Sequence, residues 1–344
     1  MNYRSFLFNF SASYSGGGLK RLVGYSQWFN ENGGASFIVN YRLKGIENAF
    51  PANKFYFLKQ SVFTRVINSS KQLDEIIVNT GPVDFYYSYG IPLQGKIGRV
   101  NWFHLSNVLP LKNRNYGIPL KRRFEFQILG LLIRYSLRHA DIISAESLSS
   151  LELFKKKIQP KLKLSVNGSD DEIDEFQRRL ISGSATEPNN IAITVGTYYY
   201  KCIGDVYKIY LHLRESNPTL ALILVGEKDF IPQSILKDPL VIARGLLPHA
   251  EVRELLKHAR YYLTSTIIEN SSNATSEGVF LASESFLSDI GPHRELLKGM
   301  NFQKIDNIGT LLPILSVKSI DLNDRNLKSW QEVIIEMLNI IQKH

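Results

Sequence analysis

Short runs of β-branched and aromatic residues alternate with longer stretches of helical periodicity along almost the whole chain of 344 residues. In the first half, a strand at 5–10 precedes a helical pattern at 19–30, and the alternation continues to a strand at 161–166. In the second half, it starts again with strands at 191–195 and 220–225. Strands that alternate with helices form parallel sheets with helices on both faces. The pattern therefore predicts an α/β fold.

The chain is longer than one typical core supports, so we expect two domains. The turn signal Asn167-Gly168 is followed by acidic residues, which is typical of an exposed linker and places the boundary near 166. We predict an N-terminal domain at 1–165, a C-terminal domain at 166–322 and an amphipathic terminal helix at 323–344. Further predicted strands are 35–41, 54–58, 84–89, 99–105, 141–144, 240–242 and 261–268, and further helices are 65–79, 118–139, 147–157, 203–214 and 249–258.

The formal net charge is +9, from 41 Lys and Arg against 32 Asp and Glu, which favours phosphate-bearing partners or an anionic membrane surface. The single cysteine, Cys202, excludes an internal disulfide and a cysteine-based zinc site, and no other cluster predicts a metal. There is no run of eighteen apolar residues and no signal-peptide pattern at the N-terminus. We therefore expect a cytoplasmic protein.

Two carboxylates, Glu269 and Glu277, flank a short run of small polar residues. The run before Glu269 has the composition of a buried strand, and the Ser, Asn and Thr residues after it are typical of the start of a helix. A strand end followed by a helix N-terminus offers backbone N–H groups and a positive dipole end to an anion. The arrangement predicts a ligand that carries both hydroxyls and phosphates. Taken alone, Glu277 also fits a surface residue that complements the helix dipole.

The stretch 261–295 resembles the donor-binding region of retaining GT-B glycosyltransferases, specifically glycosyltransferase family four. The resemblance rests on ordered features: Gly245 in VIARGLL, the helix at 249–258, the strand, the glutamate pair, and then SDIG with Glu295. It implies a GT-B fold, in which two Rossmann-like domains with parallel sheets face each other across a cleft and the C-terminal helix crosses back to the first domain.

The resemblance also implies roles for particular residues. Glu269 would contact hydroxyls of the donor sugar, and Glu277 would contact the nucleotide ribose. His104, at the end of a predicted strand, matches a histidine that such enzymes carry near the donor sugar, although a strand-end histidine bonded to a backbone carbonyl is an equal alternative. The remaining donor-binding candidates are the glycine turn Gly16, Gly17 and Gly18 after the first strand, and Asn270, Ser271, Ser272, Asn273 and Ala274.

Family members usually carry Gly-Arg and a Lys-Gly pair after the first strand of the second domain, and this chain departs from that pattern with VGTYYYKCIGD. Gly196 is kept and Thr197 stands where arginine is common. Either Lys201 or Cys202 falls at the usual lysine position. We predict that Lys201 contacts the phosphates, and the alternative is an ordinary surface lysine.

The function that the resemblance implies is transfer of a sugar, with retention and without a metal or other cofactor, from a nucleotide diphosphate sugar to a hydroxyl. The acceptor would be a glycan or a polyprenyl-diphosphate-linked intermediate of bacterial surface polysaccharide (O-antigen or capsule) synthesis. A nucleic-acid-binding protein is an alternative suggested by the charge, but no helix-turn-helix, RRM or zinc pattern supports it. A Rossmann-type dehydrogenase is a third, without a convincing G-x-G-x-x-G fingerprint.

The helix predicted at 118–139 combines an apolar stripe with a basic cluster. One interpretation packs the stripe on the sheet and leaves a solvated basic outer face. The other makes the basic residues a contact for the inner face of the cytoplasmic membrane. The apolar residues are Phe124, Ile128, Leu131, Leu132 and Tyr135, and the basic ones are Lys121, Arg122, Arg123, Arg134 and Arg138, with Lys112 and Arg114 nearby.

Overall fold

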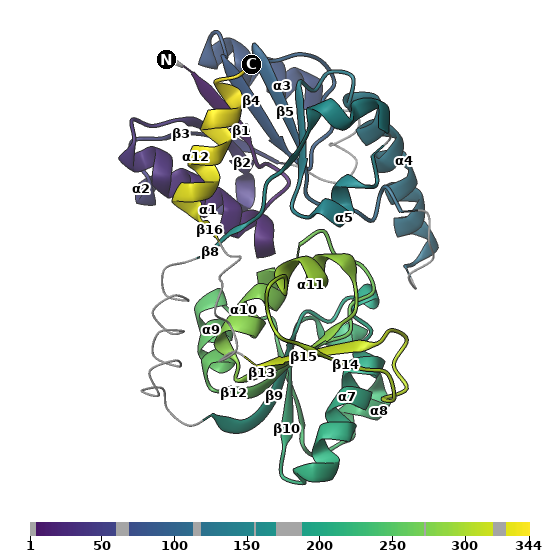
Figure 1. Cartoon of the computed structure of the whole chain (residues 1–344). Coiled ribbons are helices and arrows are strands. Elements are labelled where there is room, and N and C mark those ends of the chain that lie inside the picture. The colour runs from purple at the N-terminus through teal and green to yellow at the C-terminus, as the bar shows by residue number, and fades with distance from the viewer. Residues whose placement is uncertain are drawn as a thin grey trace. The chain divides into compact units, whose positions relative to one another are not determined.

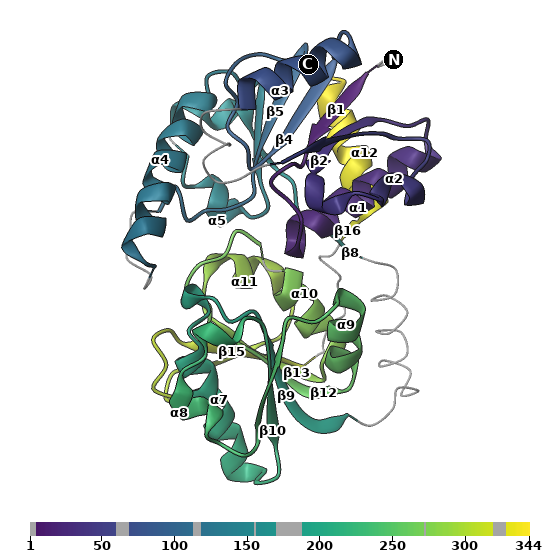
Figure 2. The same cartoon turned by 180° about the vertical axis from the view of Figure 1, so that it is seen from behind.

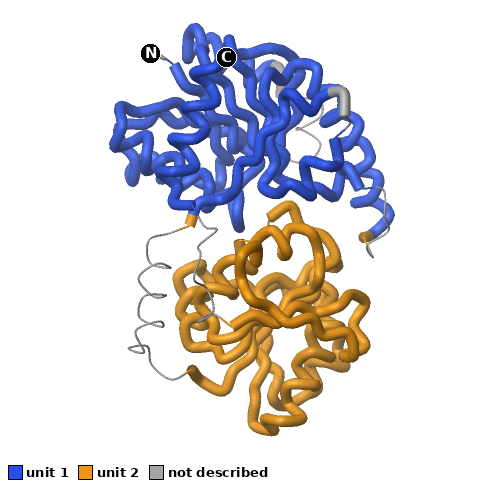
Figure 3. The backbone as a smooth tube through the Cα atoms, in the orientation of Figure 1, with its two compact units in different colours: residues 1–114, 119–168, 328–344 blue, residues 115–118, 169–327 orange. Residues whose placement is uncertain are grey.

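A computed structural model describes residues 5–59, 69–112, 118–154, 156–169, 188–271, 273–318 and 328–344. The chain divides into two compact units, coloured in Figure 3. Unit 1 contains residues 1–114, 119–168 and 328–344, and unit 2 contains residues 115–118 and 169–327. Four parts of the sequence predictions lie outside the described residues: 65–68, Arg114, 170–176 of the predicted linker, and Ser272.

Unit 1 contains a parallel sheet of seven described strands in the order β3-β2-β1-β4-β5-β6-β7. Its strands are β1 (Phe6–Asn9), β2 (Ser36–Asn40), β3 (Lys54–Leu58), β4 (Phe85–Tyr89), β5 (Val100–Leu105), β6 (Ile142–Ala145) and β7 (Leu162–Leu164). Its helices are α1 (Gly16–Glu31), α2 (Ile46–Ala49), α3 (Ser69–Thr80), α4 (Leu120–Ser136), α5 (Leu148–Leu151) and α12 (Trp330–Ile341), with 3-10 turns η1 (Tyr41–Leu43) and η2 (Lys156–Lys161). The sheet order reverses between β1 and β4, and ligands of open α/β sheets bind at the carboxyl ends of strands beside such a point.

Helices α1 and α12 lie on one face of this sheet (Figures 1 and 2). Aromatic rings fill the layer between these helices and the strands. The Phe8 and Phe37 rings stack with centroids 5.1 Å apart, and Tyr25 of α1 meets Phe8 edge-on at 5.6 Å. Because strand side chains alternate between the two faces, every second residue of β1 and β4 reaches this layer. Rigid, close-packed rings here fix the positions of the strand ends that follow them.

The C-terminal helix α12 returns to unit 1 and packs beside α1. A capping box starts it, since the Ser329 hydroxyl accepts from the Glu332 N–H at 3.2 Å and the Glu332 carboxylate accepts from the Ser329 N–H at 2.7 Å. Trp330 lies against Gly24 and Gly168, where an added Cβ atom would stand 2.4 Å from the indole in each case. The strands β8 (Gly168–Ser169) and β16 (Lys328–Ser329) also pair. The segment where the chain leaves unit 1 after 168 is therefore joined to the segment where it returns at 328.

Unit 2 repeats the plan with described strands in the order β11-β10-β9-β12-β13-β15-β14. The strands are β9 (Asn189–Val195), β10 (Ala221–Val225), β11 (Val241–Gly245), β12 (Ala259–Thr264), β13 (Glu284–Ser288), β14 (Gln303–Ile305) and β15 (Ile314–Lys318). The helices are α7 (Ile203–Ser216), α8 (Gln233–Leu236), α9 (His249–Lys257), α10 (Asn273–Leu281) and α11 (Gly291–Leu296), with 3-10 turns η3 (Tyr199–Lys201) and η4 (Lys228–Phe230). The first five strands are parallel, whereas β15 runs antiparallel to both of its neighbours, β13 and β14.

Strand β10 shows why unit 2 carries helices on both faces. Leu222 and Leu224 pack with α7, while Ile223 and Val225 pack with α9 and α10. An apolar run without polar alternation is therefore a strand buried on both sides.

Several predicted boundaries were wrong. The strand predicted at 261–268 is β12 and ends at Thr264, and the helix predicted at 147–157 shortens to α5 followed by η2. The helix predicted to start after the three glycines begins at Gly16, so Gly17 and Gly18 lie in its first turn and only Gly16 has a positive φ, of 60°. Gly18 serves packing, because a Cβ atom there would lie 2.6 Å from the Ser13 hydroxyl.

The exposed side of α4 contradicts the interpretation that its whole apolar stripe packs on the sheet, since Ile128 and Leu132 are half-buried but the rest of the stripe is exposed. Gly130, Ile133 and Ser136 are the residues that it buries. A Cβ atom at Gly130 would stand 2.2 Å from the Pro110 carbonyl oxygen, so the helix approaches its neighbours through small residues. The large side chains Leu120, Phe124, Leu131 and Tyr135 are exposed by 79%, 64%, 65% and 52%.

Candidate functional site

In unit 2 the candidate site begins in the loop after β9. Gly196 has a φ of 90°, which L side chains rarely adopt, and an added Cβ atom would lie 3.3 Å from Cε of Lys201. Thr197 is buried, and its hydroxyl donates to the Glu227 carbonyl at 2.7 Å. Gly196 therefore gives this loop its turn, and Thr197 holds it against the loop that follows β10.

Lys201 and Glu269 form an ion pair between two loops of unit 2. Nζ of Lys201 contacts Oε1 of Glu269, and the two side chains are 10% and 12% exposed. The Ile267 N–H donates to the Tyr200 carbonyl at 2.9 Å, so the backbones of the two loops are also joined. Lys201, rather than its neighbour Cys202, thus reaches the first glutamate. Two largely desolvated charges compensate each other here, and removing either one would leave the other buried.

Glu277 lies in the second turn of α10, and it is 3% exposed. Its Oε1 is 2.8 Å from Nε2 of His249, the first residue of α9, whose side chain is 47% exposed. The prediction from sequence used His249 only as a helix start and missed this contact. The second glutamate is therefore a buried carboxylate with a solvent-accessible imidazole beside it.

The segment between the glutamates leads into α10. Asn270 is buried, Ser271 is half-buried, and Asn273 and Ala274 form the half-buried first turn of the helix. Thr275, one residue further on, is buried and its Oγ1 is 3.4 Å from Nε2 of His293 in α11.

His293 holds α10 and α11 to the end of β13. Its Nδ1 donates to the Ser288 carbonyl at 2.7 Å, which leaves Nε2 as the acceptor facing Thr275. Burial lowers the pKa of His293 to about 4, so the imidazole is neutral at pH 7. Sequence reasoning missed this histidine, because its partners come from two other elements.

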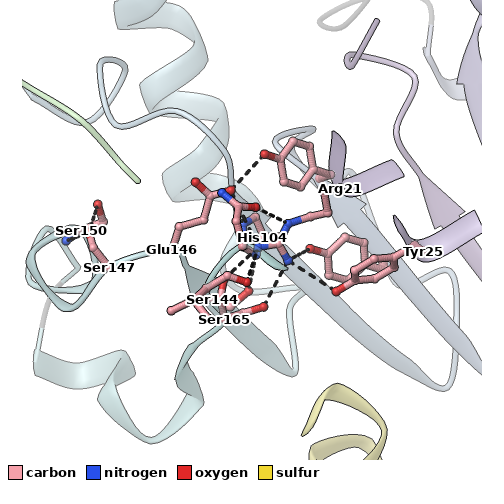
Figure 4. Close-up of polar contacts among 12 residues, drawn as sticks. Arg21, Tyr25, His104, Ser144, Glu146, Ser147, Ser150 and Ser165 are labelled. Atoms are coloured by element: carbon pink, nitrogen blue, oxygen red, sulfur yellow. Dashed lines mark hydrogen bonds and ion pairs between the residues drawn. The ribbon is translucent and has the colours of Figure 1, made fainter. Parts of the chain in front are cut away.

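In unit 1, His104 at the end of β5 is fully buried within a polar network (Figure 4). Trp102 donates to the Ser144 hydroxyl at 2.6 Å, so the hydroxyl proton is directed to Nδ1 of His104 at 2.7 Å. The proton of the imidazole then lies on Nε2, which is 3.5 Å from Oε1 of Glu146. The Tyr89 ring stacks on the imidazole at 5.0 Å and its hydroxyl donates to the same carboxylate oxygen at 3.0 Å.

Arg21 of α1 is the second fully buried centre of this network (Figure 4). Its guanidinium donates to the backbone carbonyls of Ser165 and Val166, each at 2.9 Å, and to the Asn167 side chain at 3.1 Å. It lies 3.8 Å from Oε1 of Glu146. The segment 165–167, directly before the chain leaves unit 1, is thereby bonded to the residues around His104.

Two pKa shifts describe the charge state of the network. Burial, with the charge of Arg21 adding to it, lowers the pKa of His104 to about 4. Burial opposes ionisation of Glu146, but the hydrogen bond from His104 and the charge of Arg21 outweigh it, so the pKa of Glu146 is lowered. At pH 7 the network therefore contains a neutral imidazole between an ionised carboxylate and a neutral hydroxyl.

A cavity of about 150 Å³ opens in unit 1 beside the carboxyl ends of β1, β4 and β5. Its polar lining includes Ser13, Ser106 and Asn107, and α4 contributes Phe126, Leu129 and Ile133. This is the place where parallel sheets bind ligands. The positive-φ residue Gly16, the first residue of α1, directly follows the β1–α1 connection that contains Ser13.

The described residues contain no group of three or more His, Cys, Asp or Glu side chains placed to hold a metal. No helix in the described part of the chain is long and apolar enough to cross a membrane.

No protein-family model matches the sequence, and no curated protein matches it significantly. The structure, however, is similar to sucrose-phosphate synthase from Thermosynechococcus elongatus, with a TM-score of 0.68, 12% identity and 99% of each chain covered. It is similar to a glycosyltransferase from Rickettsia africae, with a TM-score of 0.65, 14% identity, and 100% of this chain and 99% of that chain covered. It is also similar to HepE from Anabaena in complex with UDP-glucose, with a TM-score of 0.57, 14% identity, and coverage of 85% and 82%.

These structural neighbours are GT-B glycosyltransferases, and the fold of this chain is the GT-B fold. The predicted fold class is thereby confirmed, including the C-terminal helix that returns to the first unit. Within unit 2 the structure brings Lys201 to Glu269 and places Glu277 on the following helix, while His104 and the glycine turn belong to unit 1.

Proposed function

We propose that the protein is a glycosyltransferase that moves a sugar from a nucleotide diphosphate sugar to an acceptor hydroxyl with retention of configuration. The observation that carries the proposal is the Lys201–Glu269 ion pair, with Glu277 buried in the second turn of α10, in unit 2 of a GT-B fold. The neighbours support it, since HepE is in complex with UDP-glucose and another neighbour is a UDP-forming trehalose-phosphate synthase.

In the proposed reaction, negative charge grows on the departing diphosphate. In this proposal, Lys201 and the backbone N–H groups at the start of α10, both in unit 2, meet that charge. Because these groups supply the compensation themselves, the proposal needs no divalent ion. Activity that survives a chelator supports this point, and activity that returns only with added metal contradicts it.

Glu269 accepts hydrogen bonds from the donor sugar, and Glu277 accepts them from the ribose. Donor binding in this proposal exchanges partners: the diphosphate takes over Lys201, and sugar hydroxyls take over Glu269. The acceptor hydroxyl then attacks from the face that the diphosphate leaves and gives its proton to the departing phosphate oxygen as the sugar–phosphate bond breaks. The proposal includes no nucleophile for a double displacement. His104 is fully buried in unit 1, so we assign it an indirect role through its network rather than contact with the sugar.

The test is thermal stabilisation by a panel of UDP, GDP, dTDP, NAD and oligonucleotides. A ligand that binds the folded state raises the melting temperature in proportion to ln(1 + [L]/Kd). Stabilisation by one nucleoside diphosphate that is lost in Lys201→Ala supports the proposal. Stabilisation by NAD or by oligonucleotides alone contradicts it and favours a dehydrogenase or a nucleic-acid-binding protein.

For the acceptor we propose a glycan or a polyprenyl-diphosphate-linked intermediate of surface polysaccharide synthesis, reached at the inner face of the cytoplasmic membrane. The exposed stripe of α4 supports it, because an apolar face flanked by basic residues is typical of helices that lie in a membrane interface. Leu120, Phe124, Leu131 and Tyr135 form the apolar face, and Lys121, Arg122, Arg123, Arg134 and Arg138 flank it. Glu125 is paired with Arg122 at 3.0 Å.

Cosedimentation with vesicles tests the membrane contact. Binding should require anionic lipid and weaken with salt, since each basic residue near such a surface contributes about 1 kcal/mol. The variant K121S/R122S/R123S should lose the salt-dependent part, and Phe124→Ser with Leu131→Ser should lose binding that persists at high salt. The control K237S/K298S/K318S removes the same charge from exposed positions of unit 2. If the control variant loses as much vesicle binding as K121S/R122S/R123S, the binding reflects the net charge of the protein and not a contact through α4.

A further inference from the structure

The loop between Gly196 and Cys202 has one inward and one outward side. Cys202 has a φ of 47° and is the single non-glycine residue with positive φ in the part of the chain that the structure describes. At the other end, Gly196 also has a positive φ. Glycine adopts this conformation readily, whereas Cys202 is strained in it, and strained residues of this kind are concentrated at functional sites. Between these two points the chain makes the 3-10 turn η3, whose successive side chains point in different directions.

Lys201 points inward to Glu269, while two tyrosines of the same loop face solvent. Tyr198 is 43% exposed and Tyr199 is 42% exposed. Both rings contact Phe230, at centroid distances of 5.7 Å for Tyr198 and 4.6 Å for Tyr199, and the Tyr199 contact is edge-on. Tyr200 packs behind them and stacks on Tyr198 at 6.0 Å. The exposed rings are thus held in place by other rings and need little ordering when a ligand arrives.

This aromatic platform, defined as Tyr198, Tyr199 and Phe230, lies close to the ion pair. Nζ of Lys201 is 5.9 Å from the centre of the Tyr200 ring, and Tyr200 in turn contacts Tyr198. Two ring contacts therefore separate the Lys201 ammonium from the platform.

We propose that the aromatic platform binds a pyranose ring by stacking, as a carbohydrate subsite next to the Lys201–Glu269 pair. A pyranose has an apolar C–H face, which suits the negative face of an aromatic ring, and a rim of hydroxyls. The rim finds partners here, because Glu227, Lys228 and Asp229 are exposed on the turn that precedes Phe230. Flat rings bordered by carboxylates and an ammonium match a sugar better than a lipid chain, which would leave those charges without hydrogen-bonding partners.

The sugar ring on the platform has two possible sources, the donor sugar and the acceptor glycan. The inference rests on the proposed function only in placing the platform beside a donor site; the stacking of a sugar on the rings does not depend on it. Two arms of one experiment separate the sources. The first arm measures, by calorimetry, the affinity for a nucleoside diphosphate and for its sugar conjugates. The second arm screens the full chain on a broad array of neutral glycans and then measures the affinity for the glycans that bind.

The test variant is Y198A/Y199A, with Y198F/Y199F as the conservative variant and Tyr41→Ala as a control that removes an exposed ring from unit 1. The double alanine variant should lose about ten-fold or more in affinity for the sugar conjugate or for the arrayed glycan, since two stacked rings are lost. The variant Y198F/Y199F and the control Tyr41→Ala should keep most of the wild-type affinity. Unchanged melting temperatures of the free proteins show that the variants fold.

Loss confined to the sugar conjugate assigns the platform to the donor sugar, and loss of neutral glycan binding assigns it to the acceptor. Equal binding by wild type and Y198A/Y199A in both arms overturns the inference. The inference is also overturned if Y198A/Y199A binds the nucleoside diphosphate without a sugar more weakly than wild type does, because the rings would then stack on a base. If no nucleotide binds the wild type while glycan binding depends on the two tyrosines, the proposed function fails and the platform stands.

Discussion

Replacing Glu146 by glutamine should destabilise unit 1 specifically. The substitution keeps the size of the side chain and removes the charge that faces Arg21. Arg21 is fully buried and the Glu146 side chain is 4% exposed, with 3.8 Å between the guanidinium and the carboxylate. Glu146→Gln therefore leaves a buried cation without its counter-charge, which is the destabilising way to change a buried pair.

The expected loss follows from the distance. Two unit charges 3.8 Å apart interact by about 4 kcal/mol at the effective dielectric constant of 20 that suits protein sites. Measured losses on breaking buried pairs span roughly 3–5 kcal/mol. The hydrogen bonds from Arg21 to Ser165, Val166 and Asn167 remain and favour the lower end. We expect a decrease of about 3 kcal/mol in the free energy of unfolding of unit 1.

Tryptophan fluorescence isolates unit 1, because all three tryptophans of the chain, Trp28, Trp102 and Trp330, lie in that unit. Urea unfolding followed by their emission gives the free energy of unfolding without a contribution from unit 2. Glu31→Gln is the matched control, since it removes an exposed carboxylate from α1. It should change stability by less than about 0.5 kcal/mol.

The pH dependence checks the cause. The pKa of Glu146 is lowered below its ordinary value of 4.5, so its stabilising charge is fully present above that value and is lost as the pH falls through the folded-state pKa. The gap between wild type and Glu146→Gln should therefore be constant near neutrality and narrow below pH 4.5. A loss no larger than that of Glu31→Gln, or a gap that stays open in strong acid, would refute the reasoning.

Three further changes test other parts of the molecule. In wild type, the unfolded chain binds a proton at His104 between pH 6.5 and about 4 while the folded protein does not, so unit 1 loses stability as the pH falls through that range. His104→Asn should make this loss of stability smaller. An unchanged pH dependence of the unfolding free energy, followed by tryptophan fluorescence, argues against it. Glu277→Ala should weaken nucleoside diphosphate binding by about ten-fold or more in calorimetry, since a charge-assisted hydrogen bond contributes roughly 1.5–3 kcal/mol; equal affinity removes Glu277 from the site. Glu269→Gln should lower turnover while the nucleotide stays bound, and wild-type turnover would contradict its assignment to the sugar.

The sequence predicted the parts of the fold that depend on local pattern. Buried strands such as β9 and β10 are apolar on both faces, and the terminal helix is amphipathic, so both are visible without any tertiary information. Strand β15 was missed, because a five-residue run after a proline carries little periodicity and its antiparallel pairing with β13 is a tertiary property.

The predicted site residues came from a family resemblance, and contacts that a resemblance does not align depend on the tertiary structure. Arg21 and Asn167 are 146 positions apart, and no local signal connects an arginine in a helix to a turn that distant. His249 was missed for the same reason, as its contact with Glu277 depends on how α9 and α10 pack. The sequence left the orientation of α4 open, because periodicity defines a stripe but not the side that faces the sheet. Gly130, which allows the close approach to Pro110, decides that side.

The two glutamates of unit 2 present different requirements to a ligand. A hydroxyl that displaces His249 from Glu277 leaves a half-exposed imidazole, which water can solvate. A hydroxyl that displaces Lys201 from Glu269 leaves an ammonium in a site that is 10% exposed, and that cation needs a new negative partner. A neutral sugar cannot meet this requirement, whereas a sugar joined to a diphosphate brings the charge with it. The ion pair therefore favours ligands that carry hydroxyls and phosphate together.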